Sequence, residues 1–297
     1  MRNRRKIFIA LACAIAVGAL AWIVTRDREP TYDGESLTYF VLRSPPDYSP
    51  QAYKAGERVA KAIEQIGTNA IPYLIKWLQY EEPKPNWKTQ LRATVRRRLG
   101  KDIFNSTGID RASLAPLAFQ PLGPKADPAI PELTRLANQS KTGNVPKRAI
   151  WALALIRTTN ALPPLINIVT NRQHSLRKVA VDALRFMGDT ARPALPIIID
   201  CLKDADLEIA RAAASTLGVL KLEPELVVPA LIQALQDSRP EVQTMVALAL
   251  KEFGTAARPA IPALQKLLDA SNPNVMISAD SALRRIAPEV LTNSPSQ

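Results

Sequence analysis

Histidine and cysteine are scarce in this chain of 297 residues. The sequence contains one histidine, His174, and two cysteines, Cys13 and Cys201. A single histidine excludes metal centres built from several histidines, and it excludes most cysteine–histidine nucleophilic pairs. Because Cys13 falls in an apolar run near the N-terminus, Cys201 has no disulfide partner in the remaining chain, and we expect it to be a buried core residue. No cofactor and no metal are expected.

Glycine and aromatic residues are also few. The chain has 11 glycines, and aromatic residues make up 5% of it. The glycines form neither a phosphate-binding loop nor a nucleophile elbow. Carboxylate pairs such as Glu81 and Glu82 lie beside Pro83 and Pro85, without an apolar pocket that would raise a carboxyl pKa. The sequence therefore favours a protein without enzymatic activity.

The C-terminal part of the chain repeats itself every 33 residues. Residues 175–188, 208–221, 241–254 and 274–287 align, with apolar side chains at the second, sixth, tenth and thirteenth positions of each segment. This spacing places the apolar side chains on one face of a helix. A proline opens a second apolar run before each such helix, and proline suits a first helical turn because the N–H groups there need no partner in the helix. These prolines are Pro131, Pro164, Pro196, Pro229 and Pro262.

A fixed period of this length predicts a solenoid of helix pairs, in which each pair buries its apolar face against its neighbours. The repeated sequence pattern consists of a Pro-Ala-Leu run in the first helix, an aspartate in the turn (Asp204, Asp237 or Asp269) and a second helix such as residues 176–188. In this sequence pattern the units resemble HEAT repeats of the short kind found in phycobilisome-lyase-like proteins. The resemblance covers residues 51–290 and implies an all-α fold, a right-handed α–α superhelix of six to seven helix pairs.

The period continues towards the N-terminus with one interruption. Residues 54–67 are predicted as a second helix, residues 70–80 as a first helix and residues 87–100 as its partner. Residues 101–127 then break the period and are predicted to be an insertion. Insertions in repeat arrays map to loops, often on the binding face. A solvent loop remains one interpretation, but four apolar residues favour packing of part of the segment on the solenoid: Phe104, Leu114, Leu117 and Phe119.

An unbroken apolar run, residues 7–24, follows four basic residues at the N-terminus. A helix of this length reaches about 27 Å, enough for a thin hydrocarbon core. Residues 1–25 are therefore predicted to be a membrane anchor. Because the basic excess precedes the run, the N-terminus is expected in the cytoplasm and the body on the periplasmic side of a bacterial inner membrane. A cleaved signal segment, followed by secretion, stays open as an alternative, as does lipoprotein processing at Cys13.

Two polar segments flank the predicted solenoid. Residues 26–50 contain four prolines and are predicted as a linker with one short helix near residues 37–42. Residues 291–297 are predicted as a polar tail. The body is therefore expected to hang from the membrane on a stalk.

The net charge of +12 is unevenly distributed. Residues 158–297 carry equal numbers of acidic and basic side chains, so the excess lies before them. A nucleic-acid-binding solenoid would need a basic stripe along its length, because each phosphate contact needs its own cation. Nucleic acid is not an expected partner.

One segment places arginines where other second helices carry alanine and leucine. Arg92 and Arg96 occupy these columns, and buried unpaired arginines would be very costly. Either the apolar face shifts to Trp87, Leu91 and neighbouring positions, or these arginines meet a partner. The shifted face predicts an exposed patch that attracts anions such as acidic lipid headgroups. The patch comprises Arg92, Arg96, Arg97, Arg98 and Lys101.

The resemblance implies that second helices line the concave face, where positions off the apolar stripe form the candidate binding surface. Arg211 there has an alternative role as the partner of Asp204 in a structural ladder, and Trp151 has one as a core contact. We predict a membrane-tethered scaffold that binds a protein or peptide on this face. The alternative is an enzyme of bilin-lyase or DNA-glycosylase type, which would need a deep pocket. The candidate residues are Lys147, Trp151, Lys178, Arg185 and Arg211.

Overall fold

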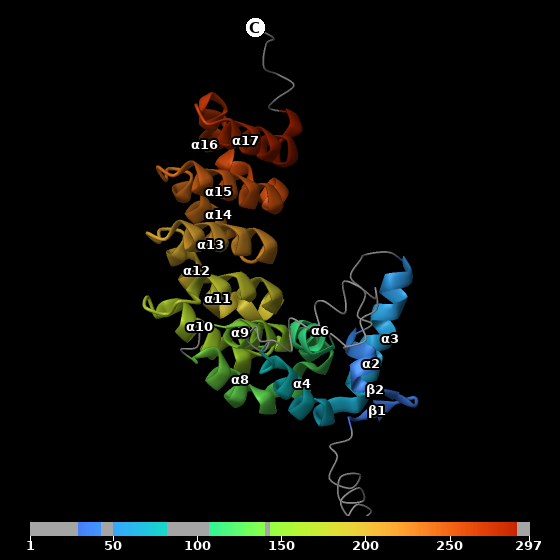
Figure 1. Cartoon of the computed structure of the whole chain (residues 1–297). Helices are drawn as coiled ribbons and strands as arrows, with labels where there is room; N and C mark the ends of the chain where they lie inside the picture. The colour runs from blue at the N-terminus through green and yellow to red at the C-terminus, as the bar shows by residue number, and fades with distance from the viewer. Residues whose placement is uncertain (1–28, 43–49, 82–106, 140–142, 290–297) are drawn as a thin grey trace, which may run out of the picture.

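Stacked pairs of short α-helices make up most of the structure, a computed structural model that describes residues 29–42, 50–81, 107–139 and 143–289 (Figure 1). Five regular pairs follow one another along an arc, as the 33-residue period predicts. Their first helices are α8 (Ile130–Ala137), α10 (Leu162–Thr170), α12 (Leu195–Cys201), α14 (Pro224–Ala234) and α16 (Ile261–Lys266). Their second helices are α9 (Asn144–Ile156), α11 (Arg177–Leu184), α13 (Leu207–Leu220), α15 (Pro240–Phe253) and α17 (Pro273–Ile286).

Proline opens the first helices largely as predicted. Pro131, Pro196 and Pro262 each stand in the first turn of their helix, where the missing N–H costs no helical hydrogen bond. Helix α14 differs, because it begins at Pro224 and contains Pro229 in its interior. Short 3-10 segments precede most of these helices: η3 (Gly123–Ala129), η4 (Thr159–Ala161), η5 (Arg185–Ala194) and η6 (Gly254–Ala260). A further one, η7 (Leu267–Asp269), follows α16.

The predicted apolar stripe of the second helices is buried. Leu184, Leu217, Leu250 and Leu283, one from each repeat, have no exposed surface. Helices α13, α15 and α17 pack closely on one another, whereas the first helices α10, α12 and α14 barely touch. Because neighbours lie closest together on the inner side of an arc, the second helices form the concave face, as expected from the resemblance.

Most of the described second helices end at a residue with positive φ, whereas α17 ends at Ala287 with φ of −153°. Gly123, Gly188 and Gly254 have φ of 50°, 58° and 55°, and Arg157 and Lys221 take the same role at φ of 58° and 52°. A positive φ ends the helical path and turns the chain towards the next first helix. In this solenoid the helix ends are therefore set by geometry, and glycine is the commonest but not the required residue.

Within the predicted insertion at residues 101–127, residues 107–122 take the place of a second helix. The solvent-loop interpretation is therefore wrong for these residues, and the packing of part of the segment on the solenoid is confirmed. This segment comprises α6 (Thr107–Leu114), η2 (Ala115–Ala118) and α7 (Phe119–Leu122). It packs between the first helix α4 (Ile71–Leu78) and α9, with Phe119 fully buried. Gly123 then ends it as Gly188 ends its own helix. The extra residues of this unit therefore lie before Thr107.

A sequence signal marked this register. The nine residues from Gly123 to Pro131 repeat the pattern of residues 188–196 and 254–262, with glycine first, alanine fourth, proline sixth and proline last. If Gly100 ends the second helix, the extra residues follow it, whereas Gly123 as the helix end places the extra residues before residue 107. The predicted helix 87–100 and the predicted patch of Arg92, Arg96, Arg97, Arg98 and Lys101 lie outside the described residues.

The N-terminal elements pack against the solenoid. A short antiparallel hairpin of β1 (Thr31–Tyr32) and β2 (Glu35–Ser36) leads into α2 (Leu37–Leu42), the short helix that the sequence predicts. Phe40 of α2 is almost fully buried, so residues 29–42 belong to the body and not to a linker. Helix α3 (Pro50–Ile66) follows and packs beside α7, and η1 (Gly67–Ala70) joins it to α4.

The described residues thus hold six helix pairs, preceded by α3, within the predicted six to seven. The predicted membrane segment, residues 7–24, lies outside them. In the part of the chain that the structure describes, every helix is too short or too polar to cross a bilayer.

Candidate binding surface on the concave face

The predicted binding residues lie on neighbouring second helices. Lys147 and Trp151 belong to α9 and Lys178 to α11, while Arg185 follows directly at the end of α11. Arg211 lies on α13, the next second helix. The structure therefore brings these side chains to one face, although their surroundings differ.

A single carboxylate neutralises much of the positive charge near α11. Asp182 accepts from the Nζ of Lys178 at 2.9 Å and from the Nη2 of Arg185 at 2.9 Å. The Asp182 side chain is only 13% exposed, so the two cations share one partly buried anion. Lys147, on the preceding helix, is exposed. The local excess is therefore smaller than the three cations in the sequence suggest.

Trp151 packs edge-on against Phe186, with ring centroids 5.3 Å apart. It is half-buried against the core, which favours the core-contact interpretation of this residue. Phe186 is the more open aromatic at 38% exposure, and the Arg185 guanidinium lies 5.7 Å from its ring centroid. Sequence reasoning missed Phe186. It follows Arg185 directly, two positions beyond the apolar stripe residue Leu184, and this position outside the stripe was the available signal.

The predicted pairing of Arg211 with Asp204 is wrong. The Nη1 of Arg211 donates to Glu208 at 2.8 Å, one turn earlier on the same helix. Asp204 instead accepts at 2.7 Å from the Nη2 of Arg177, which comes from the preceding repeat. Arg177 also donates to the carbonyl oxygen of Val169 in its own turn. A ladder of arginine–aspartate contacts between repeats is therefore present, but the arginine that pairs with Asp204 comes from the preceding repeat.

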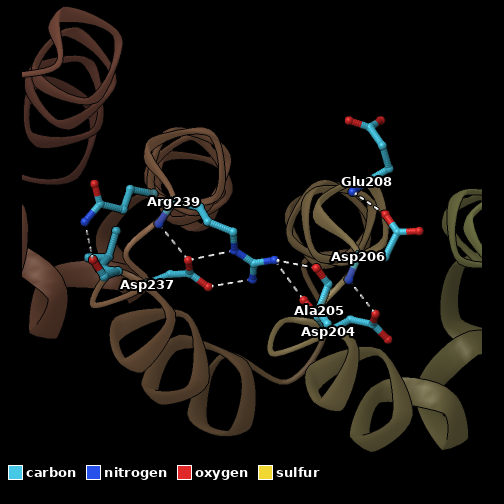
Figure 2. A network of polar contacts seen from close by, with 8 residues as sticks. Asp204, Ala205, Asp206, Glu208, Asp237 and Arg239 are labelled. Atoms are coloured by element: carbon cyan, nitrogen blue, oxygen red, sulfur yellow. Dashed lines mark hydrogen bonds and ion pairs between the residues drawn. The ribbon is translucent and has the colours of Figure 1, made fainter.

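Arg239 extends this ladder to the next repeat (Figure 2). Its Nε and Nη2 hold both carboxylate oxygens of Asp237, at 2.9 and 2.7 Å. Its Nη1 reaches the preceding turn and donates to the carbonyl oxygens of Asp204 at 2.9 Å and Ala205 at 3.3 Å. The arginines thus fasten consecutive turns together along one edge of the solenoid.

The ladder shifts the titration of its acids. The hydrogen bonds from Arg239 hold the pKa of Asp237 below its usual value. Burial opposes ionisation of Asp204, yet the hydrogen bonds from the N–H of Asp206 and from Arg177 outweigh it and lower the pKa of Asp204. Both carboxylates are therefore charged in the folded protein at neutral pH.

An open groove of about 400 Å³ crosses α13, α15 and α17 on the same row of second helices. Its apolar lining comes from Met245, Leu248 and Ile277, and Ile277 is 61% exposed. Arg211 and Glu241 are its charged residues. Small polar residues complete the lining: Thr244, Asn272, Asn274, Ser278 and Ser281.

The two side chains best suited to nucleophilic or general-base chemistry lie away from this groove. Burial raises the pKa of the Cys201 thiol to about 11, so the thiol is protonated at neutral pH. Burial also lowers the pKa of His174, whose Nδ1 accepts from the N–H of Leu176. Among the residues that the structure describes, no three histidine, cysteine or acidic side chains are grouped to hold a metal ion.

A stack of helix pairs with a continuous concave row of second helices defines an α-helical repeat solenoid. The chain belongs to the HEAT repeat family, whose sequence pattern matches residues 130–218 and 195–284. No curated protein sequence gives a significant match.

Several solved structures are similar to the chain. An engineered protein is 20% identical, with 73% of this chain and 96% of that chain covered and a TM-score of 0.43. The complex of CpcE and CpcF of phycocyanin lyase from Nostoc sp. PCC7120 is 19% identical, with coverage of 87% and 98% and a TM-score of 0.38. Kap121p is 13% identical, with coverage of 88% of this chain and 38% of that chain and a TM-score of 0.45. These values are too low to carry an argument about function.

Proposed function

We propose that this protein binds an extended segment of another protein along the concave face of its solenoid and does not catalyse a reaction. The open groove over three consecutive second helices carries this proposal. It runs across repeats, whereas small-molecule sites usually enclose most of their ligand. Phe186 adds an exposed aromatic ring on the same row, and aromatic side chains are enriched at protein interfaces.

The charges of the face support an extended partner. Near α9 and α11, Asp182 pairs with Lys178 and Arg185, and Lys147 is a third, exposed cation, which leaves a net positive charge suited to an acidic stretch. Further along the face, the exposed carboxylate of Glu241 adds a negative charge to the groove that Arg211 also lines. A partner that spans several repeats would contact both the basic region near α11 and the groove near Glu241, whereas a compact ligand would contact only one of them.

A membrane anchor at residues 7–24 forms the second part of the proposal, with the body on the periplasmic side of an inner membrane. Glu29 accepts from the N–H and the hydroxyl of Thr38, at 3.1 and 2.7 Å, and pairs with Arg111 of α6 at 3.4 Å. The fold therefore holds the chain at Glu29. An anchor that ends at Val24 leaves only a short connection, so the solenoid is kept near the bilayer.

Site-specific photo-crosslinking in intact cells tests the binding face. A photoreactive side chain replaces Phe186 on the concave row or, as the control, Leu226 on the first helix α14, which is 44% exposed. We expect a discrete crosslinked protein from position 186 and none from position 226. Equal products from both positions, or a product from position 226 alone, would contradict the proposal.

Charge removal provides a second arm of this test. The variant K147Q/K178Q/R185Q is expected to lose the product crosslinked from position 186, while D182N retains it. Glutamine is preferable to glutamate here, because new acids beside Asp182 would repel that carboxylate and disturb the fold.

A further inference from the structure

We infer that the groove over α13, α15 and α17 docks a polypeptide segment in which a cationic side chain neighbours an aliphatic one. This inference deepens the proposed function, because it assigns a chemical preference to one part of the concave face. It rests on charge, exposed apolar surface and unused hydrogen-bonding groups within the groove.

The unpaired charge in the groove lining is negative. Arg211 is already held by Glu208 at 2.8 Å, and Arg239 beside the groove is held by Asp237 at 2.7 Å. Glu241 lines the groove, is exposed and forms no ion pair within the described residues. An incoming lysine or arginine therefore finds a carboxylate without a direct ion pair, although Arg239 lies within electrostatic range of it. An incoming acid has to compete with Glu208 for Arg211.

The apolar lining of the groove suits contact with an aliphatic side chain. Ile277 is the most exposed large hydrophobic residue of the described structure, at 61%. It shares the groove with Met245 and Leu248, which are half-buried. Covering these three side chains removes apolar surface from water, which favours binding in proportion to the area covered.

The remaining polar groups suit a peptide main chain. Asn272 uses its Oδ1 to cap α17 by accepting from the N–H of Asn274 at 2.9 Å, which leaves its amide donor available. Ser281 lines the same groove. Carbonyl oxygens along an extended segment are acceptors of the required kind.

Fluorescence anisotropy of labelled nonapeptides with the purified full chain tests the inference. Four peptides share neutral flanks and differ in their central pair: Lys-Leu, Glu-Leu, Lys-Ser and Glu-Ser. We expect Lys-Leu to bind about tenfold or more tightly than each of the others. Its affinity should fall with added salt, because the Debye length shrinks from about 10 Å at 0.1 M to about 3 Å at 1 M ionic strength.

Matched variants assign the preference to the groove. E241Q should remove the advantage of Lys-Leu over Glu-Leu, whereas E225Q, at an exposed acid in the first turn of α14, should leave it unchanged. I277S should remove the advantage of Lys-Leu over Lys-Ser. M276S, at the neighbouring exposed residue that does not line the groove, should leave that advantage intact.

The inference is overturned if the four peptides bind with equal affinity. It is also overturned if the preference for Lys-Leu persists in both E241Q and I277S. Sedimentation showing that Ile277 holds two copies of the chain together while no peptide binds overturns it as well. These results leave the proposed function standing if position 186 still crosslinks to a partner. Loss of the crosslink from position 186, with selective Lys-Leu binding retained, instead confines binding to the groove and refutes only the extended binding mode.

Discussion

At the scale of single residues, Gly218 of α13 lies in close contact with the backbone of Ala249 of α15. A Cβ added at Gly218 would lie 2.9 Å from the Cα of Ala249 and 3.1 Å from its Cβ. Both are rigid parts of a helix, so no flexible side chain can move aside. The absence of a side chain at this position therefore sets how closely these two second helices pack.

The variant G218V is expected to lower the free energy of unfolding by about 1–3 kcal/mol, the usual cost of overpacking. This loss should exceed the gain from replacing a helical glycine. Chemical denaturation measures it, and V219A, at the exposed neighbouring residue, serves as the control with an expected change within about 0.5 kcal/mol. Equal stability of G218V and the wild type would show that the helices can separate without cost.

The pair of Arg177 and Asp204 is the best-buried link of the arginine ladder, with side chains 11% and 12% exposed. R177M should destabilise the fold by about 3–5 kcal/mol, because it leaves Asp204 buried without its cation. R177M/D204N should recover part of that loss. A double-mutant cycle by chemical denaturation measures the coupling, and purely additive effects would show that the ladder contributes nothing.

The same pair sets an acid limit to stability. The pKa of Asp204 is lower in the folded protein than in the unfolded chain, so its charged form favours folding. This contribution is complete above the unfolded pKa of about 4 and is lost as the pH falls through the folded value. We expect D204N to be less stable than the wild type at neutral pH and to depend less on pH between about pH 5 and pH 2. A parallel pH profile of the two proteins would contradict this.

At the scale of elements, each second helix is buried between its two neighbours. Leu217 of α13 and Leu250 of α15 have no exposed surface, and their helices pack on each other. A repeat in such an array draws much of its stability from the interfaces with its neighbours. Damage to one helix should therefore spread along the solenoid.

L217A or L250A should each cost about 2–5 kcal/mol through the lost contacts and the cavity left behind. Hydrogen exchange should rise in the adjacent pairs as well as in the mutated one. Exchange that rises only within the mutated pair, or a cost below about 1 kcal/mol, would argue against interfaces as the source of stability.

The second helix made of α6, η2 and α7 shows how an element can be hidden in a sequence. Its central part carries Pro116 and includes a 3-10 turn, so it lacks the uninterrupted periodicity of α13 or α15. Ala115 and Phe119 are nevertheless fully buried. Packing against α4 and α9 compensates for weak local signals, and a reading based on periodicity alone assigns the segment to a loop.

At the scale of the whole molecule, the proposed anchor and the solenoid make a prediction about topology. In a bacterial host, protease added outside the inner membrane should digest the body, and the intact protein should stay with the membrane in high salt. The basic residues before residue 7 are the reason for predicting this orientation. Digestion only after the inner membrane is broken would reverse the orientation, and a soluble periplasmic product would indicate cleavage.

The sequence by itself determined the class of fold. Apolar residues at helical spacing, repeated every 33 residues and opened by prolines, leave few ways to bury every stripe except a stack of helix pairs. The starts of α12 and α16 and the bounds of α13, α15 and α17 agree closely with the repeat, whereas α14 begins at Pro224 and not at Pro229, and α11 ends at Leu184. The buried leucines Leu217, Leu250 and Leu283 were predicted one by one, because their burial follows from local spacing.

Only the tertiary structure decided the details that depend on neighbouring repeats. Arg211 pairs with Glu208 because its own helix places that carboxylate within reach, and Asp204 pairs with Arg177 because stacking brings the preceding repeat against its turn. The groove likewise arises where side chains from three helices meet. A repeat period specifies what each helix buries, whereas side-chain partners and grooves follow from how far apart and at what angle successive pairs stack.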